Sequence, residues 1–376
     1  MSQILAGASL ITPTEILVDG WLEIDGGTIT ALGAGTPPRE ADVDLGGGYL
    51  SPGFIDIHTH GGGGATVVGA DPDAVAQFAT AHRRHGTTTI MASLVSAYPE
   101  ALARDVAAMA DLVEDGIVVG THLEGPWIAP EYKGAHDPGT LRDPDPAEVD
   151  ALFRAGRGTI RMVTIAPEWE HGVDCVRRTV GAGAIAAVGH TNATYDQAHA
   201  AVEAGATVTT HLYNAMRPIN HREPGPIVAL TEDPRVTNEL ILDGVHVHHA
   251  SAAFARRAAE GRVVLITDAM SAAAGDDGDY MLGDLAVKVV DGVARLVEGG
   301  AIAGSTLTMD RAVSFAVQQV GLDLVDAYAA ATSTPARLLG LTDRGVLAPG
   351  TRADLCHMTD DLELTAVWSQ GQPVSR

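Results

Sequence analysis

The middle of the chain alternates short apolar runs with longer amphipathic stretches. Stretches such as 71–86 and 145–156 open with Asp-Pro and close on Gly, as helices commonly begin and end. Eight strands separated by helices predict a closed parallel (β/α)8 TIM-type barrel of the α/β class, with an open doubly wound sheet as the structural alternative. The apolar runs that predict these buried strands are 53–60, 87–94, 116–124, 160–168, 185–190, 207–211, 238–246 and 262–269.

The two ends of the chain follow a different pattern. Polar and apolar residues alternate there around Asp-Gly and Gly-Gly turns, which predicts short strands. We therefore expect a small β-sandwich domain formed by residues 1–50 together with 342–376, and a barrel domain of residues 51–341. From Asp276 to Ala303 the alternation of strands and helices is interrupted by a predicted hairpin insertion.

Charge and composition narrow the class of protein. The 376 residues carry a formal net charge of -24, which disfavours nucleic acid and anionic membranes as partners. The first twenty residues lack the features of a signal peptide, and no apolar run is long enough to span a bilayer. With only Cys175 and Cys356, the chain has no disulfide framework, although these two could pair. We expect a cytoplasmic protein.

Ionisable residues end six of the eight predicted strands. In a (β/α)8 barrel the carboxyl ends of the strands meet at one mouth, where active sites lie. A single such histidine is more often a satisfied core residue than a ligand, but six strands ending alike predict a shared metal site. The residues are His58 and His60, His122 and Glu124, His190, His211, His246, and Asp268.

The types of these residues indicate the chemistry. His58 and His60 are two apart, so they face the same side of a strand. Glu124, His190 and His211 offer one carboxylate and two imidazoles, a set that suits zinc or a related divalent ion and leaves a position open for water. Asp268 is then free to take a proton from that water and pass it to a leaving group. This combination predicts a metal-dependent hydrolase.

A carbamylated lysine bridging two ions is not expected here. The two lysines, Lys133 and Lys288, lie in a loop and in the inserted hairpin rather than at strand ends. This argues against the ring-opening hydrolases that resemble dihydroorotase and hydantoinase. If two ions bind, Glu124 is the expected bridge.

Several motifs carry a more specific resemblance. PGFIDIHTHG, HLEGPWIAPEYKGAH, GHTNAT, HLYNAM, REPG, DGVH, TDAM and AGSTLTM resemble the N-acetylglucosamine-6-phosphate deacetylases of the amidohydrolase superfamily, over about residues 45–310. The resemblance implies hydrolysis of N-acetylglucosamine 6-phosphate to glucosamine 6-phosphate and acetate. It assigns Glu124, His190 and His211 to the main metal site and Asp268 to acid–base catalysis.

The resemblance also implies how the sugar phosphate is bound. His136 would contact the substrate near its amide carbonyl and stabilise the oxyanion. A planar arginine fork suits phosphate oxygens, which an acidic protein must grip locally. The remaining substrate-binding positions are Ala135, Asn214, Ala215, Arg222, His246, Ile302, Ala303 and Gly304. In this family the phosphate site is shared across a homodimer, with Arg222 and His246 reaching the neighbouring subunit's ligand.

Some alternatives stay open at this stage. Family members that keep both strand-one histidines can hold two ions, so His58 and His60 imply one or two ions per subunit, zinc being favoured over iron, manganese or cobalt. Arg217 and His221 are extra basic residues that either bind the anion or lie on the surface. A different N-acyl substrate, such as N-acetylgalactosamine 6-phosphate or an N-acyl amino acid, and a non-enzymatic scaffold are the other interpretations.

Overall fold

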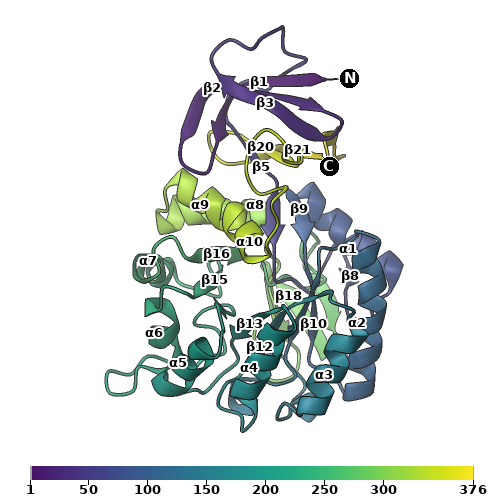
Figure 1. The fold of residues 1–376 in the computed structure, drawn as a ribbon, viewed down its shortest axis with the longest axis vertical. Helices are drawn as coiled ribbons and strands as arrows, with labels where there is room; N and C mark the ends of the chain where they lie inside the picture. The colour runs from purple at the N-terminus through teal and green to yellow at the C-terminus, as the bar shows by residue number, and fades with distance from the viewer. Residues whose placement is uncertain (1, 284, 376) are drawn as a thin grey trace. The chain divides into compact units, whose positions relative to one another are not determined.

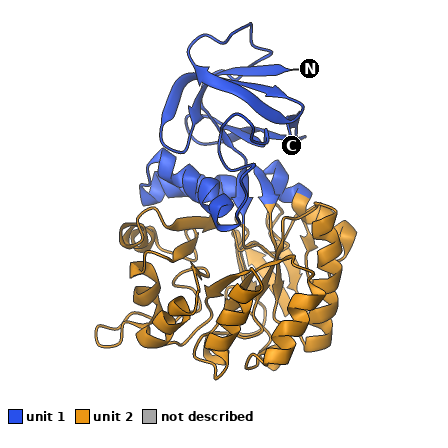
Figure 2. Cartoon of the chain, in the orientation of Figure 1, with its two compact units in different colours: residues 1–56, 80–89, 308–376 blue, residues 57–79, 90–307 orange. Residues whose placement is uncertain are grey.

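The computed structural model describes residues 2–283 and 285–375. The chain forms two compact units, shown in different colours in Figure 2. One comprises the segments up to Asp56, Thr80–Thr89 and from Thr308 onward, and the other comprises Ile57–Ala79 and Ile90–Leu307. The domain boundaries expected at residues 50 and 342 stay a prediction.

The first unit is built around a sheet that contains strands from both ends of the chain. In the described residues this sheet is eight-stranded, and β20, from near the C-terminus, pairs with β5. Its apolar core includes Leu5, Leu22 and Trp368. A separate β domain formed from the N- and C-terminal segments is thus confirmed (Figure 1). The strands are β1 Gln3–Ile11, β2 Ile16–Asp25, β3 Thr28–Ala34, β4 Val43–Asp44, β5 Tyr49–Pro52, β20 Leu355–Met358, β21 Leu364–Ser369 and β22 Gln372–Pro373.

Around this sheet and at the start of the barrel region, the described residues form four further helices and two further strands. β6 pairs with β9 in a small two-stranded sheet. The elements are β6 Phe54–Asp56, β9 Thr87–Ile90, α8 Met309–Phe315, the π-helix Ala316–Val320, α9 Leu324–Ala331 and α10 Ser333–Leu338.

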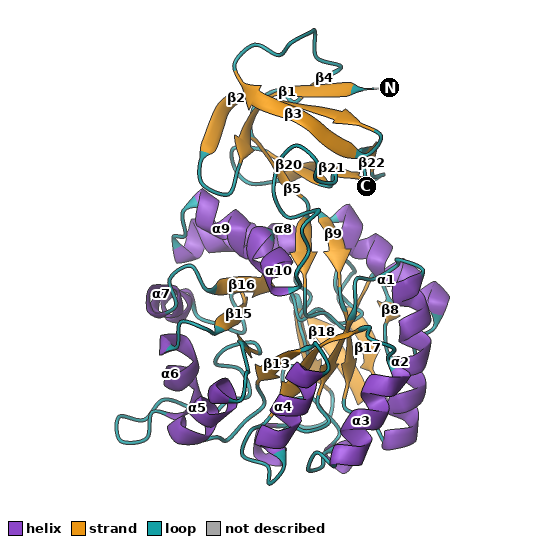
Figure 3. Ribbon diagram, viewed as in Figure 1, coloured by secondary structure: helices purple, strands orange, loops and turns teal. Residues whose placement is uncertain are grey.

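The second unit contains the parallel sheet of the barrel. Within the described part of the chain, seven strands follow one another in the order β10 to β16, each hydrogen-bonded to the next in parallel. The helices α2 to α7 lie outside these strands (Figure 3). The strands are β10 Ala92–Val95, β11 Thr121–Glu124, β12 Ile160–Ile165, β13 Ile185–Val188, β14 Val208–Thr209, β15 Thr237–Ile241 and β16 Val263–Ile266.

The segment His58–His60 lies between the two edge strands of this sheet. The Ser93 amide in β10 donates to the carbonyl oxygen of Thr59 over 2.9 Å, and the Asp268 amide, just after β16, donates to that of His58 over 2.9 Å. These bonds close the curled sheet into a (β/α)8-type barrel, as predicted.

Helix starts agree with the sequence signals. Asp145 caps α3 by accepting hydrogen bonds from the amides of Ala147 and Glu148, and Pro146 occupies the first helical position. Thr194 and Gln197 form a reciprocal capping box at α5. The helices are α1 Pro72–Arg84, α2 Pro99–Glu114, α3 Pro146–Ala155, α4 Gly172–Gly181, α5 Tyr195–Glu203, α6 Gly225–Glu232 and α7 His249–Ala258, with 3-10 turns at Pro130–Tyr132 and Pro138–Thr140.

The predicted barrel strands are shorter in the structure than expected, among them the runs 116–124 and 238–246. The run 116–124 becomes a strand only at Thr121, because Gly116, at a φ of 76°, ends the turn that terminates α2. The run 238–246 ends at Ile241, and His246 lies in a turn instead of a strand end. There the side chain of Asp243 accepts hydrogen bonds from the amides of Val245 and His246, over 2.8 Å each.

The expected insertion forms a three-stranded antiparallel sheet of β17 Gly278–Leu282, β18 Leu285–Val290 and β19 Val293–Leu296. Its apolar side packs with Met270 and Ala303 in a small separate cluster. Two short strands, β7 Gly61–Gly62 and β8 Ala65–Thr66, pair just after the first barrel segment. Among the described residues, every helix is too short or too polar to cross a membrane.

Candidate active site

The predicted ligands converge at the mouth of the barrel, all within the second unit. They form two groups whose ligand atoms lie within 4.8 Å of one another, and all of these residues are buried. One group is Glu124, His190 and His211, and the other is His58, His60 and Asp268. These residues are far apart in the sequence but lie together in the structure, as the sequence interpretation required.

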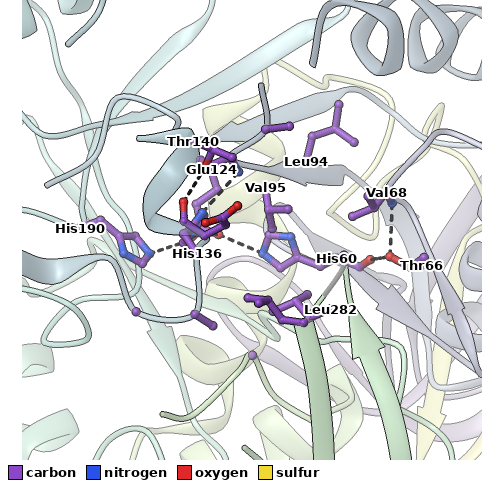
Figure 4. A pocket seen from close by; sticks show the side chains of 18 of the residues that line it. His60, Thr66, Val68, Leu94, Val95, Glu124, His136, Thr140, His190 and Leu282 are labelled. Carbon is purple, nitrogen blue, oxygen red and sulfur yellow. Dashed lines mark hydrogen bonds and ion pairs between the residues drawn. The ribbon is translucent and has the colours of Figure 1, made fainter. Parts of the chain in front are cut away.

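Within the first group, one carboxylate oxygen meets two imidazoles. Oε1 of Glu124 lies 3.0 Å from Nε2 of His190 and 3.0 Å from Nε2 of His211, and the two Nε2 atoms are 2.9 Å apart. Figure 4 shows His60, His136 and His190 turned toward Glu124. Glu124 thus forms the centre of the cluster.

The second group adjoins the first through the same carboxylate. Nε2 of His60 lies 3.2 Å from Nε2 of His58 and 3.2 Å from Oδ1 of Asp268. Oε2 of Glu124 is 3.2 Å from Nε2 of His60, while its Oε1 is 3.4 Å from Nε2 of His58. Because Glu124 reaches both groups, its position suits a ligand that bridges two ions.

Hydrogen bonds at the outer side of the rings fix which nitrogen faces the cluster. Nδ1 of His60 donates to the carbonyl oxygen of Ser93 over 2.8 Å, and Nδ1 of His190 donates to that of Tyr132 over 2.7 Å. Their Nε2 atoms therefore present lone pairs inward. Lone pairs brought this close repel one another unless a cation lies between them, so the donor set fits a divalent metal.

The carboxylates dominate the electrostatics of the cluster. Burial alone would lower the pKa of His60, but hydrogen bonds with Asp268 and Glu124 raise it to about 9. Burial alone would raise the pKa of Asp268, but His58 and His60 lower it to about 2. A metal ion binding here competes with protons for the imidazoles, so its affinity depends on pH.

His136 has the opposite arrangement of its ring nitrogens. Its Nδ1 accepts a hydrogen bond from the Ser96 amide over 3.3 Å, so the proton is on Nε2, which lies 3.3 Å from Oε2 of Glu124. Burial lowers the pKa of His136, which keeps the ring neutral. A neutral imidazole with an inward N–H can donate to a carbonyl oxygen or an oxyanion.

Three of these residues have unusual backbone conformations. His190, His211 and Asp268 adopt positive φ values of 47°, 25° and 49°. Each follows the end of a barrel strand, and the left-handed turn aims its side chain across the mouth. Such backbones cost on the order of 1–3 kcal/mol each and persist where the surroundings enforce them, as at functional sites.

The cluster opens into a cavity of about 590 Å³. His60, Glu124, His190, His211 and Asp268 line it, whereas His58 is fully buried behind them. Seven of the nine predicted substrate positions also line it: Ala135, His136, Asn214, Ala215, His246, Ile302 and Gly304.

His246 lines this same cavity, where its Nδ1 lies 2.7 Å from Oδ2 of Asp243. The described residues that line the cavity do not include Arg222 or Ala303. Arg222 is exposed and contacts His221, and Ala303 is buried beneath the inserted hairpin. His246 thus lies where it can contact a ligand bound in this cavity, whereas Arg222 does not line the cavity.

Other features of the site escaped the sequence interpretation. Glu239 in β15 is completely buried and accepts a hydrogen bond from Nδ1 of His58. Its only signal in the sequence is a carboxylate within the strand predicted over 238–246. Leu94, Val95 and Leu282 form an apolar part of the cavity wall (Figure 4). The two cysteines, Cys175 and Cys356, are buried and form no disulfide with each other.

Comparison with known proteins gives one consistent picture. The profile described as the amidohydrolase family matches residues 49–374. The chain is 36% identical over 381 residues to the N-acetylgalactosamine-6-phosphate deacetylase of Escherichia coli O157:H7, covering 100% of both. It is 34% identical over 356 residues to the N-acetylglucosamine-6-phosphate deacetylase of Vibrio furnissii, covering 93% of this chain and 89% of that protein.

A solved structure is still more similar. It is a mutant of N-acetyl-D-glucosamine-6-phosphate deacetylase from Mycobacterium smegmatis, in complex with N-acetyl-D-glucosamine-6-phosphate. The two chains share 49% sequence identity with a TM-score of 0.97, and the match covers 100% of each.

Proposed function

The chain belongs to the amidohydrolase family, and from this we propose that it hydrolyses N-acetylglucosamine 6-phosphate to glucosamine 6-phosphate and acetate. One observation carries the proposal: a carboxylate (Asp268) and an imidazole N–H donor (His136) face the same buried cluster of metal-ligand atoms in one cavity. Metal-assisted hydrolysis of an amide uses these three components together.

The residues that would hold a divalent ion are Glu124, His190 and His211, and those for a second ion are His58, His60 and Asp268. An ion bound there lowers the pKa of water and polarises the amide carbonyl. Zinc is the ion that this nitrogen and oxygen donor set favours, with iron, manganese or cobalt as alternatives. Two ions per chain are proposed, since both groups are complete.

The chain's own residues account for the proton transfers. The Nε2–H group of His136 donates a hydrogen bond to the carbonyl oxygen, without transferring its proton, and stabilises the negative charge that develops on that oxygen. Asp268, whose pKa is lowered to about 2, is ionised at neutral pH and accepts the proton of the attacking water. It then gives that proton to the departing sugar amine, which leaves as a neutral group.

The sugar phosphate is proposed to extend from the cluster toward Asn214, Ala215 and His246. Burial alone would lower the pKa of His246, but the hydrogen bond and the charge of Asp243 raise it, which makes the ring a better partner for phosphate. Ala135, Ile302 and Gly304 would enclose the substrate from the other side.

Arg222 is proposed to contact the phosphate of a second subunit in a homodimer. It is exposed on the loop between β14 and α6. Three large exposed apolar side chains occur in the same part of the sequence, Ile219, Val245 and Phe254. Covering them in a subunit contact would remove apolar surface from water. A cytoplasmic location is part of the same proposal, in keeping with two cysteines that form no disulfide with each other.

The decisive experiment is to measure acetate release from N-acetylglucosamine 6-phosphate, before and after chelation and with metals restored. N-acetylgalactosamine 6-phosphate belongs in the same assay, because a relative covered over its whole length is named for that substrate. N-acetylglucosamine without phosphate is the third substrate. Equal kcat/KM with and without the phosphate would refute the sugar-phosphate assignment, and a preference for the galactosamine substrate would reassign the epimer.

A further inference from the structure

Glu239 makes two hydrogen bonds that link the two ligand groups. It lies in β15, and its side chain is completely buried. Its Oε2 atom accepts one hydrogen bond from Nδ1 of His58 and one from the backbone amide of His211, each over 3.0 Å. His58 belongs to the group with Asp268, and His211 belongs to the group with Glu124. A single oxygen atom therefore contacts both halves of the cluster.

The bond to His58 determines how that ring can act. Since Nδ1 donates to Glu239, Nε2 of the neutral ring presents its lone pair inward, 3.2 Å from Nε2 of His60 and 3.4 Å from Oε1 of Glu124. His58 itself does not line the cavity and has no exposed surface, so it contacts neither substrate nor solvent. Its place in the cluster suits metal binding alone.

The bond to His211 acts on the backbone. His211 adopts a φ of 25°, and its amide is directed to Glu239 in place of a strand partner. This turn brings Nε2 of His211 to 3.0 Å from Oε1 of Glu124. Loss of the Glu239 carboxylate would free the turn and the ring of His58 together.

The second carboxylate oxygen of Glu239 bears on how the negative charge of the cluster is balanced. Oε1 has no hydrogen-bond partner among the described residues. Glu124, Asp268 and Glu239 place three carboxylates in one buried cluster, and the described lysine and arginine side chains make no ion pair with any of them. An uncompensated buried charge is strongly unfavourable. One divalent ion leaves a net negative charge on this set, whereas two ions compensate all three carboxylates.

We infer that Glu239 is a positioning residue that enables the cluster to hold a second divalent ion, by orienting His58 and adding the charge that the second ion balances. The inference rests on the metal dependence in the proposed function. It predicts that Glu239 controls how many ions bind, more than how the substrate binds. Outer carboxylates of this kind typically change metal affinity by 10–100-fold.

The test compares metal binding by wild type, Glu239→Gln and Glu239→Leu. Apoprotein is titrated with Zn²⁺ by calorimetry, and the metal content of loaded, gel-filtered protein is measured by mass spectrometry. We expect two ions per wild-type chain, with the second bound about 10–100-fold more weakly in Glu239→Gln. Glu239→Leu is expected to retain one ion. Glu239→Gln keeps the size of the side chain and serves if the leucine variant does not fold.

Glu168→Gln is the matched control. Glu168 is also a largely buried carboxylate at the barrel mouth, and it accepts hydrogen bonds from the Thr191 hydroxyl and the Asn192 amide, over 2.5 Å each. It makes no hydrogen bond to a histidine ring, so the variant is expected to retain two ions. His58→Asn should also bind one ion, and adding Glu239→Gln to it should produce little further loss, since both changes affect the same ion.

Thermal unfolding separates this role from a purely structural one. Replacing a buried carboxylate that lacks a partner for one oxygen should leave the melting temperature of the apoprotein unchanged or higher, while the increase produced by metal becomes smaller. A variant with a lower apoprotein melting temperature and two ions still bound would overturn the inference. A wild type that holds one ion at saturation would overturn it too. Full metal loading without deacetylation would contradict the proposed function instead.

Discussion

Oδ1 of Asp268 lies 3.2 Å from Nε2 of His60, so the proposed general base is itself in contact with the ligand cluster. In the proposed function, the carboxylate would therefore bind a metal ion and accept a proton from one position. Its lowered pKa, near 2, follows from the neighbouring histidines, which outweigh the effect of burial.

Replacing Asp268 with asparagine should lower kcat by about 10²–10⁴-fold, because the amide cannot accept the proton of the attacking water. The ion bound by Glu124, His190 and His211 should be retained. Steady-state kinetics and metal analysis on the same sample check this. A variant that keeps its metal and turns over at a near-normal rate would end the assignment of Asp268 as the base.

Replacing His136 with phenylalanine should reduce kcat by about 10²–10³-fold with a smaller change in KM, since its Nε2 hydrogen is proposed to stabilise charge that develops only during the reaction. His171, which pairs with Asp143 at the surface, provides a control through His171→Phe. A loss at His136 that appeared entirely in KM would indicate a role in ground-state binding only.

Removing the metal should abolish activity and lower the melting temperature. The cluster gathers carboxylates and inward-facing lone pairs that repel one another without a cation. At a metal concentration of 1,000 times Kd, binding contributes about 4 kcal/mol to the free energy of unfolding. Scanning fluorimetry with and without a chelator measures the shift. Unchanged activity in protein shown to be metal-free would disprove metal dependence.

Arg222→Gln should raise KM for the phosphorylated substrate by about 10-fold or more and leave the slow hydrolysis of unphosphorylated N-acetylglucosamine unchanged, because a charge-assisted bond to phosphate contributes about 1.5–3 kcal/mol. Arg217→Gln, on the same loop, is the companion variant and distinguishes surface charge from direct contact. If the homodimer proposal holds, mixing Arg222→Gln with a catalytically inactive Asp268→Asn chain should change activity through mixed dimers. Equal effects of Arg222→Gln and Arg217→Gln would mean that both arginines act through the electrostatic field of the surface, and would contradict direct contact of Arg222 with the phosphate.

The pair of His246 and Asp243 should make the free energy of unfolding depend on pH in a defined window. Burial opposes ionisation of both groups, but their mutual hydrogen bond raises the pKa of His246 above its usual 6.5 and lowers that of Asp243 below its usual 3.8. The stabilisation that this pair contributes is therefore fully present between the ordinary pKa of Asp, 3.8, and the ordinary pKa of His, 6.5. It is lost as pH rises through the raised pKa of His246, and as pH falls through the lowered pKa of Asp243.

Denaturant unfolding of wild type and His246→Asn at several pH values tests this. The difference between them should be largest near pH 5 and should shrink at alkaline pH. A difference that is constant from pH 5 to 9 would mean that the pair contributes through packing alone.

The convergence of the candidate ligands could be predicted from the sequence because barrel topology makes the ends of separate strands neighbours. His58, Glu124, His190, His211 and Asp268 are far apart in sequence, yet the parallel strand order brings them within 4.8 Å in two groups. Asp-Pro signals also located helix starts, since a side-chain cap is a local interaction. Local and topological signals were sufficient for these features.

Glu239 could not be predicted in the same way. A glutamate that follows Thr237 and Asn238 in a short strand has the same sequence signal whether it faces outward to solvent or inward to His58. The position of Arg222 is also beyond reach, because a motif shows that a residue is present but not where its loop directs it. His246 was expected at the end of a strand, but β15 ends at Ile241 and His246 lies in the turn that Asp243 stabilises.

The positive φ angles of His190, His211 and Asp268 have one more consequence. Because folding has already imposed these turns, an arriving ion finds its ligands in place and requires little backbone rearrangement. A rigid, mixed set of nitrogen and oxygen donors discriminates weakly between divalent ions of similar size. Which metal the enzyme carries in the cell should then be decided by supply, and growth in media enriched in a single metal should yield protein loaded with that metal.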